Sequence, residues 1–114
     1  FLFNRNNGAD GYQHLNINEY CENYFGQSNH VLVDVRTQSE YKQGHIPGAI
    51  NIPLNKLSGS TDSIPKGKPV VVVCASGNRS KTGSKFIVQA GHEEVYNLKG
   101  GTMTWMMGQH PIEM

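Results

Sequence analysis

The sequence predicts an α/β domain built on a parallel β-sheet with helices on both of its faces. Short β-branched runs alternate along the chain with segments of helical periodicity, which is the pattern of β–α–β units. The strongest run, Val70 to Val73, is apolar throughout, as expected of a strand buried on both faces of a sheet. The chain has 114 residues, a size that suits one compact domain. We therefore expect residues 1–114 to form a single domain, with residues 1–10 as a loosely ordered terminal segment.

Local signals indicate the first helix and the first strand. Asn16 and Glu19 form a capping-box pattern, in which two side chains satisfy free backbone amides at the start of a helix. Apolar residues then recur at helical spacing, which predicts a helix over residues 16–25. The β-branched run at residues 31–35 predicts a buried strand with Asp34 near its end.

A second capping-box pattern, Thr37 with Glu40, predicts a short helix over residues 37–43. Gly44 can end this helix in a left-handed conformation. The alternation of strands and helices continues through the rest of the chain. The further elements that we expect are a short strand at 49–52, a helical turn at 53–57, a strand at 70–73, a helix at 80–90, a strand at 94–98 and a helix at 102–107.

Composition and charge exclude several classes of function. Lys and Arg number 10 and Asp and Glu number 9, so the net charge of +1 leaves no basic stripe for a nucleic-acid partner. The apolar runs are far shorter than the roughly 20 residues of a membrane span. Cys21 and Cys74 lie far apart, so we expect neither a disulfide framework nor a metal site. We expect a cytoplasmic protein, and because residue 1 is Phe, a periplasmic or processed form stays open.

Cys74 follows the strongest strand and precedes a helix, which is where open parallel sheets bind ligands. The residues between them are Ala75, Ser76, Gly77, Asn78 and Arg79. Gly77 and Asn78 tolerate a positive φ, so this loop can curl until its backbone amides converge on one point. The helix that begins near Ser80 adds its positive end, and the site therefore suits an anion or a thiolate.

A thiolate at position 74 would be stabilised by the loop amides, the helix end and Arg79, which predicts a lowered pKa for Cys74. The same amides would stabilise a persulfide anion, whose charge lies one sulfur atom further out. The other interpretation is that Cys74 is a small buried apolar residue at the end of a strand. From local chemistry alone, both interpretations stay open.

Motifs along almost the whole chain resemble those of the single-domain rhodaneses. The first block is Asp34-Val35-Arg36, Glu40-Tyr41, Gly44-His45-Ile46-Pro47-Gly48-Ala49 and Asn51. The active-site loop runs from Cys74 to Arg79, and the second block is Gly100-Gly101 with Trp105. The order of these blocks and the gaps between them agree with the family.

The resemblance implies the rhodanese-like α/β fold, a central and mostly parallel sheet of about five strands with helices on both faces. It implies that Cys74 is the catalytic residue and carries sulfur as a persulfide, without a metal or an organic cofactor. The substrate-binding loop would be Ala75, Ser76, Gly77, Asn78, Arg79 and Ser80. The donor would be thiosulfate or a persulfide, and the acceptor a thiol, cyanide or a sulfur-accepting protein.

Loop length separates the sulfurtransferases of this family from related phosphatases and arsenate reductases. By the resemblance, a six-residue loop, here Cys74 to Arg79, accompanies sulfur transfer, and a seven-residue loop ending in Arg accompanies oxyanion chemistry. The seventh position here is Ser80, so we expect a sulfurtransferase. The alternatives are a small Cys-dependent phosphatase or arsenate reductase, and a carrier or sensory module that holds a persulfide without turnover.

Asp34, Arg36 and Glu40 are the expected supporting residues of the site. Glu40 lies four positions beyond Arg36, and we expect an ion pair between them that braces the turn facing Cys74. Mitochondrial tandem rhodaneses hold thiosulfate with basic residues at the positions of Glu40 and Ser76. This chain has a basic residue at neither position, a difference that concerns the choice of donor.

We expect structural roles for the remaining candidates. Cys21 is expected to be buried and unreactive on the apolar face of its helix. His45 is expected to anchor a turn. The histidines expected at the surface are His14, His30, His92 and His110. The helically spaced residues expected to pack in the core are Met103, Trp105, Met106 and Met107.

Overall fold

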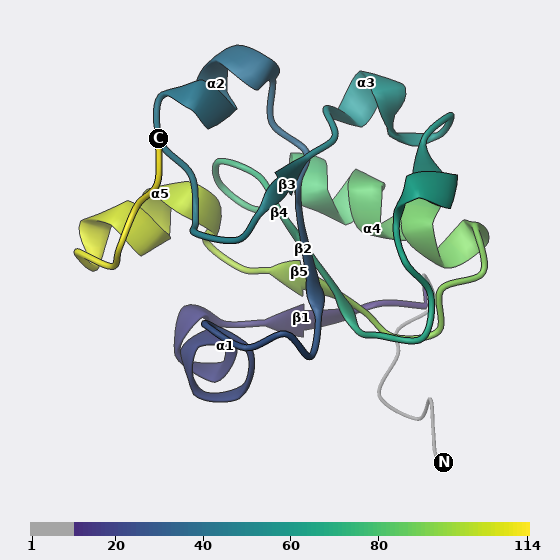
Figure 1. The fold of residues 1–114 in the computed structure, drawn as a ribbon, viewed down its shortest axis with the longest axis horizontal. Helices are drawn as coiled ribbons and strands as arrows, with labels where there is room; N and C mark the ends of the chain where they lie inside the picture. The colour runs from purple at the N-terminus through teal and green to yellow at the C-terminus, as the bar shows by residue number, and fades with distance from the viewer. Residues whose placement is uncertain (1–10) are drawn as a thin grey trace.

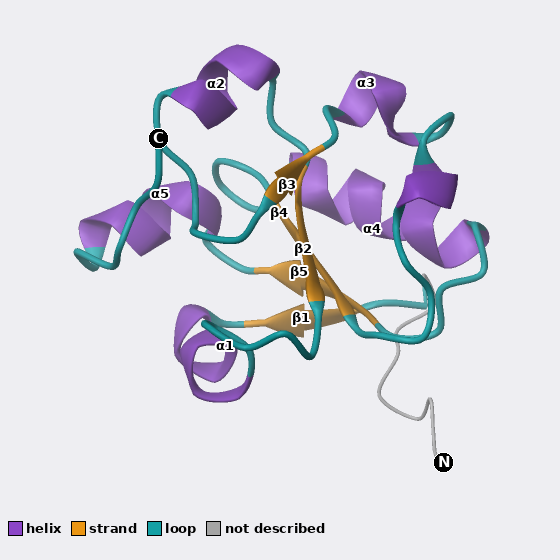
Figure 2. Ribbon diagram, viewed as in Figure 1, coloured by secondary structure: helices purple, strands orange, loops and turns teal. Residues whose placement is uncertain are grey.

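The computed structural model describes residues 11–114 and contains one five-stranded sheet whose strands all run parallel. The strands are β1 (Gln13–Leu15), β2 (Val31–Asp34), β3 (Ile50–Asn51), β4 (Val70–Val73) and β5 (Val95–Leu98). Their order across the sheet is β1-β5-β4-β2-β3, so β4 lies at the centre. Figure 2 shows the strands in orange, with helices in purple to either side of them. The predicted α/β fold with a parallel sheet is confirmed, and the expectation for residues 1–10 lies outside the described residues.

Helices cover both faces of the sheet, as predicted. They are α1 (Ile17–Asn23), α2 (Gln38–Lys42), α3 (Leu54–Leu57), α4 (Arg79–Gln89), α5 (Gly101–Met107) and a 3-10 turn (Thr61–Ser63). Figure 1 shows α1 and α5 on one side of the sheet and α3 and α4 on the other. None of these helices is both long and apolar enough to cross a membrane.

The sheet separates two hydrophobic cores, and β4 contributes to both. Val70 and Val72 face the core beneath α3 and α4, whereas Val71 and Val73 face the core beneath α1 and α5. All four side chains are fully buried, because alternate residues of a strand point to opposite faces and here both faces are covered. The all-valine strand of the sequence is therefore the central strand of the fold.

Both predicted capping boxes are present. Asn16 and Glu19 exchange hydrogen bonds of 2.8 and 2.9 Å at the start of α1. Thr37 and Glu40 exchange hydrogen bonds of 3.0 and 3.2 Å at the start of α2. Gly44 follows this helix with a φ of 145°. Two residues that cap each other satisfy amides that the helix cannot pair by itself, so these starts are determined locally.

The strand β1 is an element that the sequence patterns did not indicate. It is three residues long and, among residues 11–114, lies at the edge of the sheet and pairs with β5. A run this short carries little periodicity, so its conformation depends on the ladder formed with β5 rather than on its own residues.

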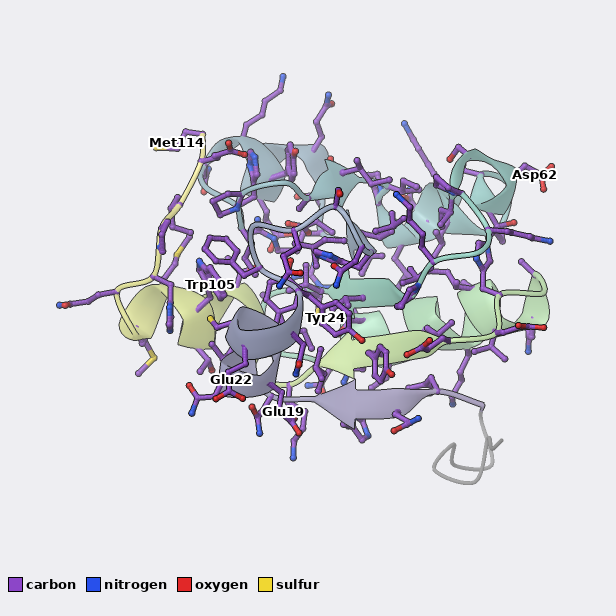
Figure 3. The ribbon with its side chains drawn as sticks, turned by 60° about the horizontal axis from the view of Figure 1, so that its bottom comes forward. Glu19, Glu22, Tyr24, Asp62, Trp105 and Met114 are labelled. Carbon is purple, nitrogen blue, oxygen red and sulfur yellow. The ribbon has the colours of Figure 1, made fainter. Side chains whose placement is uncertain are left out.

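The C-terminal helix α5 buries Trp105 completely and leaves its methionines at the surface. The Trp105 ring packs against Tyr20 and Phe25, and Figure 3 shows it beside α1, whose Glu19 and Glu22 point outward. The predicted core position of Trp105 is confirmed. The same prediction is wrong for the helix's methionines, which are 42 to 80% exposed: Met103, Met106 and Met107. Only one face of this short helix meets the sheet, and helical spacing does not specify which face that is.

Candidate active site

Cys74 lies immediately beyond the carboxyl end of β4, at the centre of the sheet. It is 1% exposed and belongs to the core beneath α4. The next helix, α4, begins only a few residues later, so the intervening loop curls around the sulfur atom. The strand–loop–helix placement predicted for Cys74 is present in the structure, at the edge where parallel sheets bind ligands.

Hydrogen bonds from the loop converge on Cys74 Sγ. The Gly77 amide donates to this sulfur at 3.1 Å, and the Ser80 hydroxyl oxygen lies 3.3 Å from it. Burial by itself raises the pKa of Cys74, but the Ser80 hydroxyl and the backbone amides of Ser80, Gly77 and Ser76 outweigh burial and lower it. Cys74 is therefore set up to ionise more readily than an ordinary cysteine.

One residue of the loop adopts the positive φ that the curl requires. Gly77 has a φ of 102°, in the region that favours glycine. Asn78, which we expected to share this role, has a right-handed φ of −87° and leads directly into α4. The helix starts at Arg79, one residue earlier than predicted.

The start of α5 holds the backbone of the loop from behind. The Thr102 amide donates to the Cys74 carbonyl at 2.8 Å, and the Met103 amide donates to the Ala75 carbonyl at 3.0 Å. Gly101 permits this approach, because a Cβ at that position would lie 2.5 Å from the Cys74 carbonyl oxygen. The sequence motifs included Gly101 in the second block but did not connect it with the Cys74 loop.

Glu40 pairs with Arg79 and not with Arg36, so the predicted Arg36–Glu40 ion pair is wrong. Two hydrogen bonds of 2.8 and 2.9 Å join the Glu40 carboxylate to the Arg79 guanidinium. The guanidinium, together with hydrogen bonds from Thr37, lowers the pKa of Glu40 to about 2. The pair connects α2 with Arg79, the residue at which the Cys74 loop meets α4.

Arg36 forms its ion pair with Asp34, two residues earlier. Its guanidinium donates to the buried Asp34 carboxylate at 2.9 Å and to the Gly44 carbonyl at 2.7 Å. Asn51 donates to the carbonyls of Asp34 and Arg36 at 3.0 Å each. This closed set of hydrogen bonds joins the end of β2 to the turn after α2 and to β3, and it supports the site without reaching the sulfur.

The histidines and Cys21 agree only in part with the positions predicted for them. His45 anchors its turn, with Nδ1 2.8 Å from the Tyr41 carbonyl and its ring stacked on the Tyr41 ring. His14 is exposed, but His92 is buried, which corrects its predicted surface position. Cys21 is only half-buried, and its sulfur lies 4.0 Å from His110 Nδ1. Within residues 11–114 no three His, Cys, Asp or Glu side chains are grouped closely enough to hold a metal ion.

A comparison with known proteins agrees with this geometry. The family model for the rhodanese-like domain matches residues 18–107. A protein of Allochromatium vinosum named sulfurtransferase is 39% identical over 82 residues, covering 72% of this chain and 77% of the relative. The thiosulfate sulfurtransferase GlpE of Coxiella burnetii is 38% identical over 81 residues, covering 71% of this chain and 75% of that protein.

Solved structures show the same likeness in three dimensions. The crystal structure of a rhodanese-related protein from Thermoplasma volcanium superposes with a TM-score of 0.80 and 30% sequence identity. The superposition covers 90% of this chain and 98% of that one. A family model that spans most of the chain, two similar sulfurtransferases and a shared fold lead to one conclusion: the chain belongs to the rhodanese-like domain family.

Proposed function

We propose that this protein is a sulfurtransferase that moves sulfane sulfur from thiosulfate or a persulfide to a thiophilic acceptor through a persulfide on Cys74. The observation that carries the proposal is the set of hydrogen-bonding groups around Cys74 Sγ: the Gly77 amide donates to it at 3.1 Å, and the Ser80 hydroxyl oxygen lies 3.3 Å from it. Membership of the rhodanese-like family and the sulfurtransferase names of its relatives support it.

The reaction is a double displacement in which atoms and charges balance. The Cys74 thiolate attacks the outer sulfur of thiosulfate, the sulfur–sulfur bond of the donor breaks, and sulfite leaves with the bonding electron pair. The product is a Cys74 persulfide anion, whose terminal charge faces the same convergent loop amides. An acceptor thiolate then attacks the terminal sulfur, takes it as its own persulfide and releases the Cys74 thiolate; cyanide would leave as thiocyanate.

The arrangement of Arg79 argues against the phosphatase and arsenate reductase alternative. Oxyanion transfer on a cysteine loop needs a guanidinium that grips the oxygens of the substrate. Here the two-pronged pair with Glu40 occupies the Arg79 guanidinium at 2.8 and 2.9 Å. Arg36, the other arginine of the candidate site, is paired with Asp34 and with the Gly44 carbonyl.

Intact mass spectrometry after incubation with thiosulfate tests the proposal directly. We expect the wild-type protein to gain the mass of one sulfur atom and to lose it on treatment with a thiol. Cys74→Ser should gain nothing, whereas Cys21→Ser, which removes the other cysteine, should behave as the wild type. A gain that survives Cys74→Ser would overturn the assignment of the nucleophile.

Two further measurements separate the alternatives. Stoichiometric loading of Cys74 without turnover on glutathione, dithiothreitol or cyanide would indicate a carrier or sensory module that passes sulfur to a protein. Hydrolysis of an aryl phosphate that depends on Cys74 would instead favour the phosphatase. We expect neither result, and we expect steady turnover from thiosulfate or a persulfide to small thiols.

A further inference from the structure

Behind Cys74, hydrogen bonds continue from the sulfur atom to the surface of the molecule. Cys74 donates to the Ser80 hydroxyl oxygen at 3.3 Å, and Ser80 in turn donates to Asn97 Oδ1. Asn97 Nδ2 lies 3.1 Å from His14 Nδ1. Ser80 comes from α4, Asn97 from β5 and His14 from β1, where the last two are direct partners across the strands. Ser80 and Asn97 are buried, whereas His14 is exposed.

In this series of hydrogen bonds, the protonation state of Cys74 decides which partner of each bond is the donor. In the thiol form, the sulfur donates to Ser80, Ser80 donates to Asn97, and Asn97 donates to an unprotonated His14 Nδ1. A thiolate has no proton and can only accept. When Cys74 ionises, the Ser80 hydroxyl must turn its single proton toward the sulfur, which leaves the buried Asn97 Oδ1 without a donor.

A half-turn of the Asn97 amide restores every hydrogen bond. The oxygen and the NH₂ group of an amide have nearly the same shape, so the exchange requires no additional space. After it, Asn97 Nδ2 donates to the Ser80 hydroxyl oxygen, and Oδ1 faces His14 Nδ1, which must then carry a proton. Each contact keeps its two residues and reverses its direction.

We propose that Asn97 is a positioning residue that matches the orientation of the Ser80 hydroxyl to the charge of Cys74, and that His14 Nδ1 registers this charge at the protein surface. The proposal rests on the role of Cys74 as the nucleophile given above. No proton travels along the chain: the thiol proton is released to solvent, and neutral His14 moves its ring proton from Nε2 to Nδ1 by exchange with water.

Other charged and titratable groups lie near the hydrogen bonds that join Cys74 to His14, and none of them is substituted in the tests below. Arg79 interacts electrostatically with Cys74 and is paired with Glu40, and Asp34 and Arg36 pair with each other. On the outer side, the ring of Tyr12 meets the His14 ring edge-on at 5.6 Å. These groups are the same in every variant, so differences between variants report on the hydrogen-bond chain.

The first test reads the ring nitrogens of His14 by ¹⁵N NMR, assigned with a His14→Gln variant. At a pH above the alkylation midpoint measured for wild-type Cys74, we expect His14 Nδ1 to carry the ring proton in the wild type, whose Cys74 is then a thiolate. In Cys74→Ser the hydroxyl stays neutral and donates to Ser80, so we expect the proton on Nε2. The same tautomer in both proteins would overturn the proposal.

The second test measures the pH midpoint of Cys74 alkylation by iodoacetamide in Asn97→Asp. A carboxylate only accepts hydrogen bonds, so it holds the Ser80 proton away from the sulfur, and we expect an upward shift of about one unit, a tenfold loss of thiolate at neutral pH. The new negative charge also repels the thiolate directly. The same substitution in a Ser80→Ala background measures this repulsion alone, and equal shifts in the two backgrounds would contradict the proposal.

The two tests are independent of each other and of sulfur transfer. The NMR comparison leaves Asn97 in place, so it decides the question even where Asn97→Asp does not fold. Neither test uses a sulfur donor. A missing persulfide with a normal His14 response would overturn the proposed function only, and a normal persulfide with no His14 response would overturn the role of Asn97 only.

Discussion

At the scale of single residues, the pKa of Cys74 results from two opposed effects on one sulfur atom. Burial disfavours the thiolate, and a hydroxyl and three amides favour it, with the balance toward a lowered pKa. Among these donors Ser80 is the one that a substitution can remove without altering the backbone. Its hydroxyl is fully buried, so no water replaces it freely.

Ser80→Ala should raise the pKa of Cys74, because it removes a donor that lowers this pKa. We expect the pH midpoint of alkylation to rise by roughly one unit, with about tenfold slower alkylation at neutral pH. Ser84→Ala is the matched control, since Ser84 is a buried serine of the same helix that donates to the Ser80 carbonyl at 2.7 Å. Equal midpoints for the wild type and Ser80→Ala would contradict this account.

At the scale of elements, the site is held by contacts between helices that are distant in sequence. The Glu40–Arg79 pair joins α2 to α4, and the Gly101 backbone lets α5 approach the Cys74 loop. The ion pair is partly exposed, with both side chains more than a third accessible, so solvent screening limits its contribution to stability to at most about 1 kcal/mol. The contact between α5 and the loop is buried, and we expect it to tolerate substitution much less than the ion pair does.

The Glu40–Arg79 pair predicts a dependence of stability on pH. The pKa of Glu40 is lowered from 4.5 to about 2, so the stabilisation is present above about pH 4.5 and is lost as the pH falls toward 2. Glu40→Gln should therefore cost stability at neutral pH and almost nothing near pH 2, as measured by urea unfolding. Glu19→Gln, in the equivalent capping position of α1, is the control. A cost for Glu40→Gln that does not change with pH would refute the prediction.

Gly101→Ala should destabilise the protein strongly. Gly101 has a φ of 62°, and a Cβ there would lie 2.5 Å from the Cys74 carbonyl oxygen. Gly67→Ala is the matched control, because Gly67 also has a positive φ, 91°, but nothing lies within 4 Å of its Cβ position. From strain alone we expect about 1 kcal/mol for Gly67→Ala, and roughly 2 kcal/mol more for Gly101→Ala, in urea unfolding. Similar costs would mean that α5 can move away from the loop without penalty.

At the scale of the whole molecule, two cores share one central strand. Because consecutive valines of β4 face opposite layers, the strand can lose packing on one side only by disturbing the sheet that supports the other. Loop, helices and sheet are then expected to unfold together, as small domains usually do. Cys74, the proposed nucleophile, directly follows this same strand.

Val71→Ala and Val72→Ala test this coupling from opposite faces of β4. Each removes two buried methyl groups and should cost about 2 kcal/mol. Trp105, the single tryptophan, lies in the layer that Val71 faces and serves as a fluorescent probe. We expect Val72→Ala, on the other face, to shift the Trp105 unfolding midpoint as much as Val71→Ala does. A Trp105 transition that ignores Val72→Ala would show that the layers unfold separately.

The parts of the fold that could be predicted are those with local causes. The two capping boxes, the all-valine strand and the position of Cys74 between strand and helix depend on residues within a few positions of one another. The prediction of the Glu40 ion pair failed because the partner of Glu40 lies far from it in the sequence. The spacing in sequence suggested Arg36 as the partner of Glu40, but Arg36 pairs with Asp34, and Glu40 pairs with Arg79, which is 39 positions away.

The sequence by itself determined the order of strands and helices, the central buried strand and the cysteine loop, because backbone propensity, capping and periodicity act over short separations. Only the tertiary structure decided that Gln13–Leu15 is a strand, that α5 buries Trp105 and exposes its methionines, and that Asn97 stands behind Ser80. Those outcomes depend on which surfaces meet when the sheet closes, and contacts between residues far apart in the chain leave no periodic signal in it.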